Sequence, residues 1–205
     1  MLNIALGKGR LADITMDKLK DIGITFPDYH SKSRKLIFTS ENNDVRLVFV
    51  KASDVGIYVE KGACDIGVCG KDTLMESTPD VYEMMDLKFG KCRFAVAAPK
   101  TFVKEPDKKI RVATKYTNVA KAYYEEKGEP IEIIKINGSV ELAPLMGLAD
   151  VIVDIVETGT TLKENGLVVT EKIADVSARL IVNKAGLKTK KDEIQKVIKA
   201  LEIQI

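Results

Sequence analysis

The stretch VIVDIVETGTTLKENGL, from Val151 to Leu167, begins like a buried strand and then stops being apolar abruptly. Asp154 and Glu157 interrupt the apolar run, and the residues TGTT follow at once. A strand that passes directly into a helix places a short turn at the carboxyl edge of a sheet, where α/β proteins bind their ligands. The stretch therefore predicts an α/β fold with a ligand-binding turn, which we call the threonine turn (Thr158–Thr161).

The composition of the threonine turn suits an anion. Gly159 allows backbone amides to approach a ligand closely, and hydroxyl donors come from Thr158, Thr160 and Thr161. The amino end of the following helix adds a partial positive charge. A strand–turn–helix junction in which the threonines only cap the helix explains the same local pattern equally well.

The two acids beside the turn need another role, because a carboxylate repels a neighbouring phosphate. Asp154, at the end of the strand, is placed to accept hydrogen bonds from sugar hydroxyls. Glu157 either joins the same site or faces water. A phosphate group attached to a ribose therefore fits the stretch better than free phosphate does.

Strands and helices alternate along the whole chain, which predicts α/β layers with mixed, largely parallel sheets. About ten β-rich runs are many for one open sheet, and one series of them ends near Lys88–Cys92. We expect two lobes with a cleft between them. The first comprises residues 1–90 and 178–205, to which the last helix returns, and the second comprises residues 91–177 with the threonine turn.

The bulk composition argues against several classes of protein. With 32 basic and 30 acidic residues the net charge is +2, which gives no general attraction to nucleic acid or membranes. Three cysteines without a CxxC pair and a single histidine, His30, argue against a disulfide framework and a zinc site. We expect inert thiols at Cys64, Cys69 and Cys92. No signal peptide or membrane span is visible, so a cytoplasmic location is expected.

Glycine-flanked cations form a second set of candidates. GKGR, from Gly7 to Arg10, comes directly after the first strand. Its Lys8 and Arg10 suit a pyrophosphate group, because arginine binds two oxygens at once and lysine supplies a point charge. Arg34 and Lys51 are weaker candidates, since isolated surface cations are common. A solvated basic turn is the competing explanation of GKGR.

Two other short motifs follow the same logic. Gly70-Lys71-Asp72 repeats the glycine–cation pattern at another strand end and is a candidate for nucleotide binding. Ser139 and Glu141, in NGSVELAP, lie at a predicted helix start. An acid in that position is favourable for the helix dipole alone, so a structural role is equally open.

Several blocks of the chain together resemble one family. The run IKINGSVELAPLMGLADVIVDIVETGTTLKENGL (134–167) is similar to the signature of ATP phosphoribosyltransferase, the first enzyme of histidine biosynthesis. Its TGTT segment resembles the phosphoribosyl-pyrophosphate loop of phosphoribosyltransferases. LGKGRL, SRKLIF, VKASDVGIYVEKGACDIGVCGKDTLME and RVATKYTNVAKAYYEEKG resemble further family blocks in the same order. The length resembles the short form, which lacks the C-terminal regulatory domain.

Two residues depart from the pattern of this family. Gly7 stands where proline is usual, and Gly56 lies in a segment that is usually more constrained. We expect the first departure to loosen the turn that carries Lys8 and Arg10. Neither departure removes a charged group.

The resemblance implies a fold similar to the type II periplasmic-binding-protein-like fold. It also implies condensation of ATP with 5-phosphoribosyl 1-pyrophosphate (PRPP) to N1-(5-phosphoribosyl)-ATP and pyrophosphate. The implied catalytic residues, on the pyrophosphate and nucleotide side in the first lobe, are Lys8, Arg10, Arg34 and Lys51. The candidate nucleotide-binding residues are Gly70, Lys71 and Asp72, from the glycine–cation pattern, and Ser139. The implied PRPP-binding residues are Glu141, Asp154, Glu157, Thr158, Gly159, Thr160 and Thr161.

The resemblance further implies the cofactor and partner. Mg²⁺ would be carried by the pyrophosphate of the substrate, without a metal site of protein residues, as suits an ion that keeps its water. A regulatory subunit resembling histidyl-tRNA synthetase would join the chain in a hetero-oligomer, a hetero-octamer. Neither nucleic acid nor a membrane is an implied partner.

Three other classes of function remain open from the residues. A two-lobed binding module of the solute-receptor type would share the architecture. A phosphoribosyltransferase of the single-domain class has a similar turn, although it usually shows two adjacent acids where this chain has Asp154-Ile155. A purely structural subunit would tolerate the loss of charge at the turn.

Overall fold

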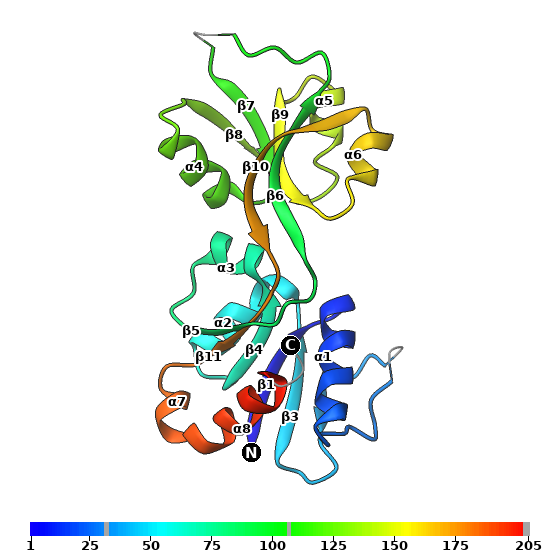
Figure 1. Ribbon diagram of the computed structural model, residues 1–205, viewed down its shortest axis with the longest axis vertical. Helices are drawn as coiled ribbons and strands as arrows, with labels where there is room; N and C mark the ends of the chain where they lie inside the picture. Colours follow the sequence, from blue (N-terminus) through cyan, green and yellow to red (C-terminus); the bar gives the residue numbers. More distant parts are fainter. Residues whose placement is uncertain (31–32, 106–107, 203–205) are drawn as a thin grey trace. The chain divides into compact units, whose positions relative to one another are not determined.

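The computed structural model describes residues 1–30, 33–105 and 108–202 of the chain (Figure 1). The chain forms two compact units, each with its own sheet. The first unit comprises Met1–Gly90 and the chain from Ser177 onward, and the second comprises Lys91–Val176. No helix in the described part of the chain is long and apolar enough to cross a membrane.

The first unit is built on a sheet with the strand order β2-β3-β1-β4-β11-β5. Its strands are β1 (Leu2–Gly7), β2 (Ile37–Thr39), β3 (Val45–Val50), β4 (Ile66–Gly70), β5 (Tyr82–Asp86) and β11 (Ala178–Val182). Its helices are α1 (Arg10–Asp21), the 3-10 turn η1 (Ala52–Asp54), α2 (Val55–Glu60), α3 (Lys71–Ser77), α7 (Gly186–Thr189) and α8 (Lys191–Glu202). The three neighbouring strands β3, β1 and β4 are parallel.

Alternation of side chains along the strands gives this sheet two buried faces. In β1, Leu2, Ile4 and Leu6 contribute to a core that also holds residues of α1 and α8. Ala5 lies on the opposite face, in a second core with Val55 and other residues of α2 and α3. The result is a three-layer α/β unit whose last helix packs on the same core as its first.

The second unit has a sheet with the strand order β10-β6-β9-β7-β8. Its strands are β6 (Cys92–Pro99), β7 (Ile110–Thr114), β8 (Ile131–Lys135), β9 (Val151–Val156) and β10 (Leu167–Val176). Its helices are α4 (Thr117–Glu126), α5 (Leu142–Leu145) and α6 (Thr160–Glu164). One face packs on α5 and α6 through Ala143 and Leu162. On the other face Phe94 meets the ring of Tyr116, at the start of α4, edge-on at 4.8 Å.

The predicted fold class, α/β with mixed and largely parallel sheets, is confirmed. Within the described residues, four of the six strands of the first sheet and four of the five of the second point the same way. The exceptions include one interior strand of each sheet. β11 runs antiparallel between β4 and β5, and β6 runs antiparallel between β10 and β9. These two strands lie where the chain passes from one unit to the other.

Candidate active site

Three neighbouring strands of the first sheet are each followed at once by a lysine. Lys8, Lys51 and Lys71 come directly after β1, β3 and β4, which are parallel and adjacent. The register pairs the last residue of β1 with the last of β3, so Lys8 and Lys51 leave the sheet at the same level. We call the carboxyl edge of these three strands the cationic edge.

The two predicted arginines also belong to the cationic edge. Arg10 is the first residue of α1, two residues after Lys8, and is exposed. Arg34 precedes β2, which runs antiparallel to β3. The amide of Phe49 donates a hydrogen bond to the carbonyl of Leu36 at 2.8 Å, so the chain before β2 continues along the carboxyl end of β3. The structure therefore brings all four predicted catalytic cations to one edge of one sheet.

Gly7 has a packing role at this edge that the sequence did not reveal. A Cβ atom at Gly7 would lie 2.7 Å from the Cα of Ala52 and 2.9 Å from its Cβ. The amide of Lys8 also donates a hydrogen bond to the carbonyl of Val50 at 3.4 Å. The missing side chain therefore allows the turns that carry Lys8 and Lys51 to touch, and the expectation that Gly7 loosens the turn stays a prediction.

A hollow beside Lys8 was also missed from the sequence. Its lining includes Lys8, Asp13, Tyr29, His30 and Phe49. The Tyr29 ring stacks on Phe49 with centroids 5.5 Å apart. Its hydroxyl donates to the Asp13 carboxylate at 3.5 Å, and burial together with Asp13 raises the pKa of Tyr29. The aromatic residues of the hollow, Tyr29, Phe38 and Phe49, lie far apart in the sequence. No local pattern therefore indicated that they come together.

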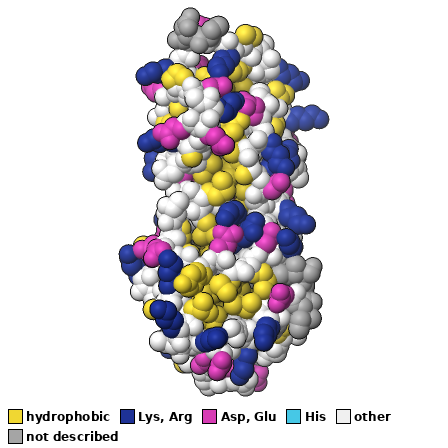
Figure 2. Space-filling model, turned by 60° about the vertical axis from the view of Figure 1, so that its left-hand side comes forward, with side chains coloured by type: hydrophobic (Ala, Val, Ile, Leu, Met, Phe, Trp, Pro, Cys, Tyr) yellow, Lys and Arg dark blue, Asp and Glu magenta, His cyan; other side chains and the backbone are white. Residues whose placement is uncertain are grey.

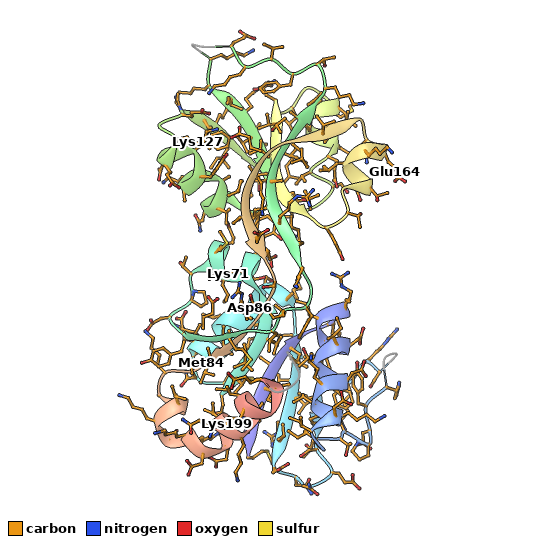
Figure 3. The ribbon with its side chains drawn as sticks, viewed as in Figure 1. Lys71, Met84, Asp86, Lys127, Glu164 and Lys199 are labelled. Carbon is orange, nitrogen blue, oxygen red and sulfur yellow. The ribbon has the colours of Figure 1, made fainter. Side chains whose placement is uncertain are left out.

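Lys71 is held by an ion pair. Its ammonium lies 2.5 Å from the Glu83 carboxylate, and Glu83 also lies 3.4 Å from Arg179. Arg179 continues the chain of charges to Asp86 at 3.4 Å. Figure 3 labels Lys71 and Asp86, the two ends of this chain. An anion that binds Lys71 would therefore compete with Glu83.

Asp86 is the most strongly perturbed carboxylate of this chain of charges. Partial burial acts to raise its pKa, but hydrogen bonds from the Lys88 amide at 2.9 Å and the Ser177 hydroxyl at 2.7 Å outweigh burial. With the Lys88 ammonium and Arg179 they lower the pKa of Asp86 to about 2. These contacts tie together the two segments that lead to and from the second unit.

The remaining predicted residues of the first unit follow β4. Gly70 is the last residue of that strand, and Asp72 is the second residue of α3. A Cβ atom at Gly70 would lie only 2.0 Å from an oxygen of the Asp72 carboxylate. The Asp72 side chain thus folds back over the end of the strand, into space that the missing side chain of Gly70 leaves open.

The threonine turn occupies the position that the sequence predicted, between β9 and α6. Gly159 has φ of 80°, a left-handed conformation that favours glycine. The hydroxyls of Thr158 and Thr160 lie 3.0 Å apart, and the Thr160 amide donates to the Thr158 hydroxyl at 3.3 Å. Thr158, Thr160 and Thr161 are exposed. The turn thus presents hydroxyls to its surroundings, and the Thr158 hydroxyl also accepts a hydrogen bond from the first amide of α6.

The predicted acids and Ser139 lie at the same edge of the second sheet. Asp154 is half-buried in β9, and its carboxylate accepts a hydrogen bond from the Ile155 amide at 2.8 Å. Glu157 follows β9 and is exposed. Ser139 and Glu141 lie between β8 and α5, and Ser139 has a positive φ of 48°. Since β8, β7 and β9 are parallel neighbours, Asp154 lies near the carboxyl end of its strand and the other three residues follow such ends.

The two buried cysteines of the first unit are not activated nucleophiles. Burial raises the pKa of Cys64 to about 11 and that of Cys69 to about 12, so both remain thiols at neutral pH. Figure 2 shows basic and acidic side chains interspersed on the face it draws. The chemistry of the site lies in the cations of the cationic edge and the hydroxyls of the threonine turn. These groups can bind anions and stabilise negative charge.

The architecture defines a class of protein before any name is considered. Two α/β units, each with an antiparallel strand inside a mostly parallel sheet, are the arrangement of periplasmic-binding-protein-like proteins. The chain is similar to the periplasmic aliphatic sulphonate binding protein SsuA from Escherichia coli, with a TM-score of 0.61. The similarity covers 98% of this chain and 70% of that one at 12% identity, and it shows the fold alone.

The chain belongs to the ATP phosphoribosyltransferase family. The family model described as HisG: ATP phosphoribosyltransferase matches residues 51–203. An ATP phosphoribosyltransferase from Bacillus cereus is 54% identical over 204 residues, which cover 100% of this chain and 97% of the relative. The ATP phosphoribosyl transferase (HisG:HisZ) complex from Thermotoga maritima contains a chain with a TM-score of 0.87 at 36% identity, covering 98% of this chain and 97% of that one. The resemblance noted in the sequence, and with it the assignment as an enzyme, is confirmed.

Proposed function

We propose that this chain condenses ATP with PRPP to N1-(5-phosphoribosyl)-ATP and pyrophosphate, the first step of histidine biosynthesis, in the cytoplasm. Family membership supports the reaction. The structural observation that supports it most directly is the cationic edge, where Lys8, Lys51 and Lys71 end three adjacent parallel strands.

The reaction needs charge stabilisation more than proton transfer. N1 of the adenine ring attacks the anomeric carbon of the ribose, and the bond from that carbon to the pyrophosphate oxygen breaks. Pyrophosphate leaves with the bonding electrons, so positive charge develops on the ribose and negative charge on the leaving group. Catalysis then consists of positioning two substrates and stabilising the departing anion, which cations and hydrogen-bond donors can do.

We assign the leaving group to the cationic edge and the ribose phosphate to the threonine turn. Pyrophosphate would be neutralised by the four cations Lys8, Arg10, Arg34 and Lys51. The 5-phosphate would accept hydrogen bonds from Thr158–Thr161, and the ribose hydroxyls would be bound by Asp154, with Glu141 and Glu157 beside them. Nucleotide contacts would come from Gly70, Lys71, Asp72 and Ser139.

We propose Mg²⁺ as the metal of the reaction, carried by the pyrophosphate oxygens and water. The described residues contain no group of three or more His, Cys, Asp or Glu side chains arranged to hold an ion. Mg²⁺ keeps several waters and binds phosphates readily, so it would enter with the pyrophosphate of the substrate. The ion would add positive charge beside the leaving group.

We propose that a regulatory subunit resembling histidyl-tRNA synthetase joins this chain in a hetero-octamer. Support comes from the similar chain of Thermotoga maritima, which is described as part of a HisG:HisZ complex. On this proposal histidine inhibits the enzyme only when the partner is present. Calorimetry on the purified chain alone tests this proposal. A saturable histidine isotherm in the micromolar range would contradict it.

Pyrophosphate release from ATP plus PRPP, with each substrate and Mg²⁺ omitted in turn, tests the proposed reaction. Release is expected only when both substrates are present, with or without a regulatory partner added. A cytoplasmic binding module would instead bind one small anion tightly and release nothing. Transfer to free bases in place of ATP would point to a salvage enzyme and would contradict the assignment of ATP.

A further inference from the structure

Arg93 lies beside the threonine turn although no family motif singled it out. It is the second residue of β6, an interior strand between β9 and β10. The register places Arg93 opposite Val156, the last residue of β9, on one side and opposite Asp175 on the other. The threonine turn begins two residues after Val156. The antiparallel pairing therefore brings the beginning of β6 to the edge where β9 ends.

The direction of the Arg93 side chain follows from its neighbours. Phe94 points to the face covered by α4, where it contacts Tyr116. Because successive side chains of a strand alternate, Arg93 points to the opposite face together with Ala95. That face is packed on α6, the helix that the threonine turn opens. Asp154 and Val156 of β9 share this face with Arg93, because they lie opposite Ala95 and Arg93.

Arg93 has no counterion within the described part of the chain. Its side chain is half-buried, yet it forms no hydrogen bond or ion pair with residues 1–30, 33–105 or 108–202. Asp175, directly opposite, pairs instead with Lys172 at 2.7 Å. In the same unit Arg111 is bound by Asp150 at 2.7 Å. A partly desolvated guanidinium without an anion is costly, so Arg93 is available to an external anion that binds near it.

The threonine turn contains no cationic residue. Its donors are hydroxyls and amides, which are neutral, while Asp154 and Glu157 beside it are acidic. A phosphate monoester is largely a dianion at neutral pH and would be repelled by these acids. Arginine is suited to the task, since its planar fork binds two phosphate oxygens at once.

We propose that Arg93 binds the phosphate monoester held by the threonine turn, as a further substrate-binding residue. The inference rests on the proposed function, in which this group is the 5-phosphate of PRPP. The guanidinium would supply the charge and the threonines the orientation. Arg93 would then affect the affinity for every ligand with a ribose 5-phosphate group and leave the affinity for ATP unchanged.

Calorimetry with ribose 5-phosphate and with PRPP tests the assignment on the full chain. Ribose 5-phosphate carries the phosphate monoester and no pyrophosphate, so it reports on the threonine turn alone. The variants are Arg93→Met, which removes the charge, and Arg93→Lys, which keeps it. Arg46→Met is the matched control, because Arg46 is a half-buried strand arginine at the amino end of β3. Arg93→Gln takes the place of Arg93→Met if the methionine variant does not melt cooperatively.

The expected result is a loss of about 10- to 100-fold in affinity for both ribose ligands in Arg93→Met, the range for a charged hydrogen bond. Arg93→Lys should recover part of the loss, and Arg46→Met should bind like the wild type. Unchanged affinities in Arg93→Met, or a loss for PRPP alone, would overturn the inference. The proposed reaction is judged separately, by pyrophosphate release from the wild-type chain.

Discussion

Replacing Gly7 by alanine should disturb the cationic edge in a measurable way. The new Cβ would lie 2.7 Å from the Cα of Ala52, so the two turns must separate by about 0.7 Å to reach ordinary van der Waals distance. The atoms concerned belong to the backbone and to a Cβ, which cannot rotate away. Overpacking of this kind costs about 2 kcal/mol. For a chain of 205 residues that corresponds to a fall in Tm of about 4–8 °C.

The same displacement should lower turnover. Lys8 follows Gly7 directly, and Lys51 precedes Ala52, so a shift between these residues moves two cations relative to each other. Misplacement on this scale typically costs on the order of tenfold in kcat. Scanning calorimetry and the pyrophosphate-release assay measure the two effects on the same protein sample.

A matched glycine provides the control for Gly7→Ala. A Cβ at Gly138 would meet no atom within 4 Å, and its φ is not positive, so Gly138→Ala should melt like the wild type. If Gly7→Ala also keeps the wild-type Tm and turnover, the backbone there yields at no cost. The argument that Gly7 sets the spacing of Lys8 and Lys51 would then be refuted.

Three other outcomes are expected. Arg34→Ala should lower kcat by on the order of 100-fold with little change in ATP affinity, because charge on the leaving group grows toward the transition state; equal losses in both would contradict that role. Gly159→Val should abolish PRPP binding in calorimetry, because its side chain would block the approach of a phosphate to the backbone amides, and should also lower Tm by a few degrees, because a β-branched residue is strained at φ 80°; unchanged affinity would leave the turn with a structural role alone. Asp86→Asn should reduce the loss of unfolding free energy that the wild type shows as pH falls. The pKa of Asp86 is about 2 when folded and about 3.9 when unfolded, so its stabilisation is complete above about pH 4 and is lost as pH falls toward 2. Urea unfolding at pH 5 and pH 2.5 measures this effect. An equal loss of unfolding free energy in the variant and the wild type would contradict the prediction.

Local sequence patterns predicted the features that depend on neighbouring residues. The passage from β9 through the threonine turn to α6 is such a feature, since apolar run, glycine and threonines are contiguous. The cations after β1, β3 and β4 could be named for the same reason. These cations share an edge because β1, β3 and β4 lie side by side in the sheet. That order depends on long-range strand pairing, which local patterns do not show.

Contacts between distant residues were beyond the reach of such patterns. Lys71 meets Glu83, and Glu83 meets Arg179, nearly a hundred residues further along the chain. The packing of Gly7 on Ala52 depends on the register of β1 with β3. Arg93 lies near the threonine turn in the sheet only because β6 runs antiparallel to β9. No local composition signals any of these relations.

The course of the chain through the two sheets also sets an order in which the protein can fold. β11, from Ala178 to Val182, lies between β4 and β5 in the first sheet. A nascent chain that ends before it leaves β5 without a strand to pair with and lacks the core residues of α8. The second unit, Lys91–Val176, is contiguous and can complete its sheet while the first still waits. During synthesis the middle of the chain should therefore become resistant to protease before the beginning does, because non-local strand pairing is the slower step.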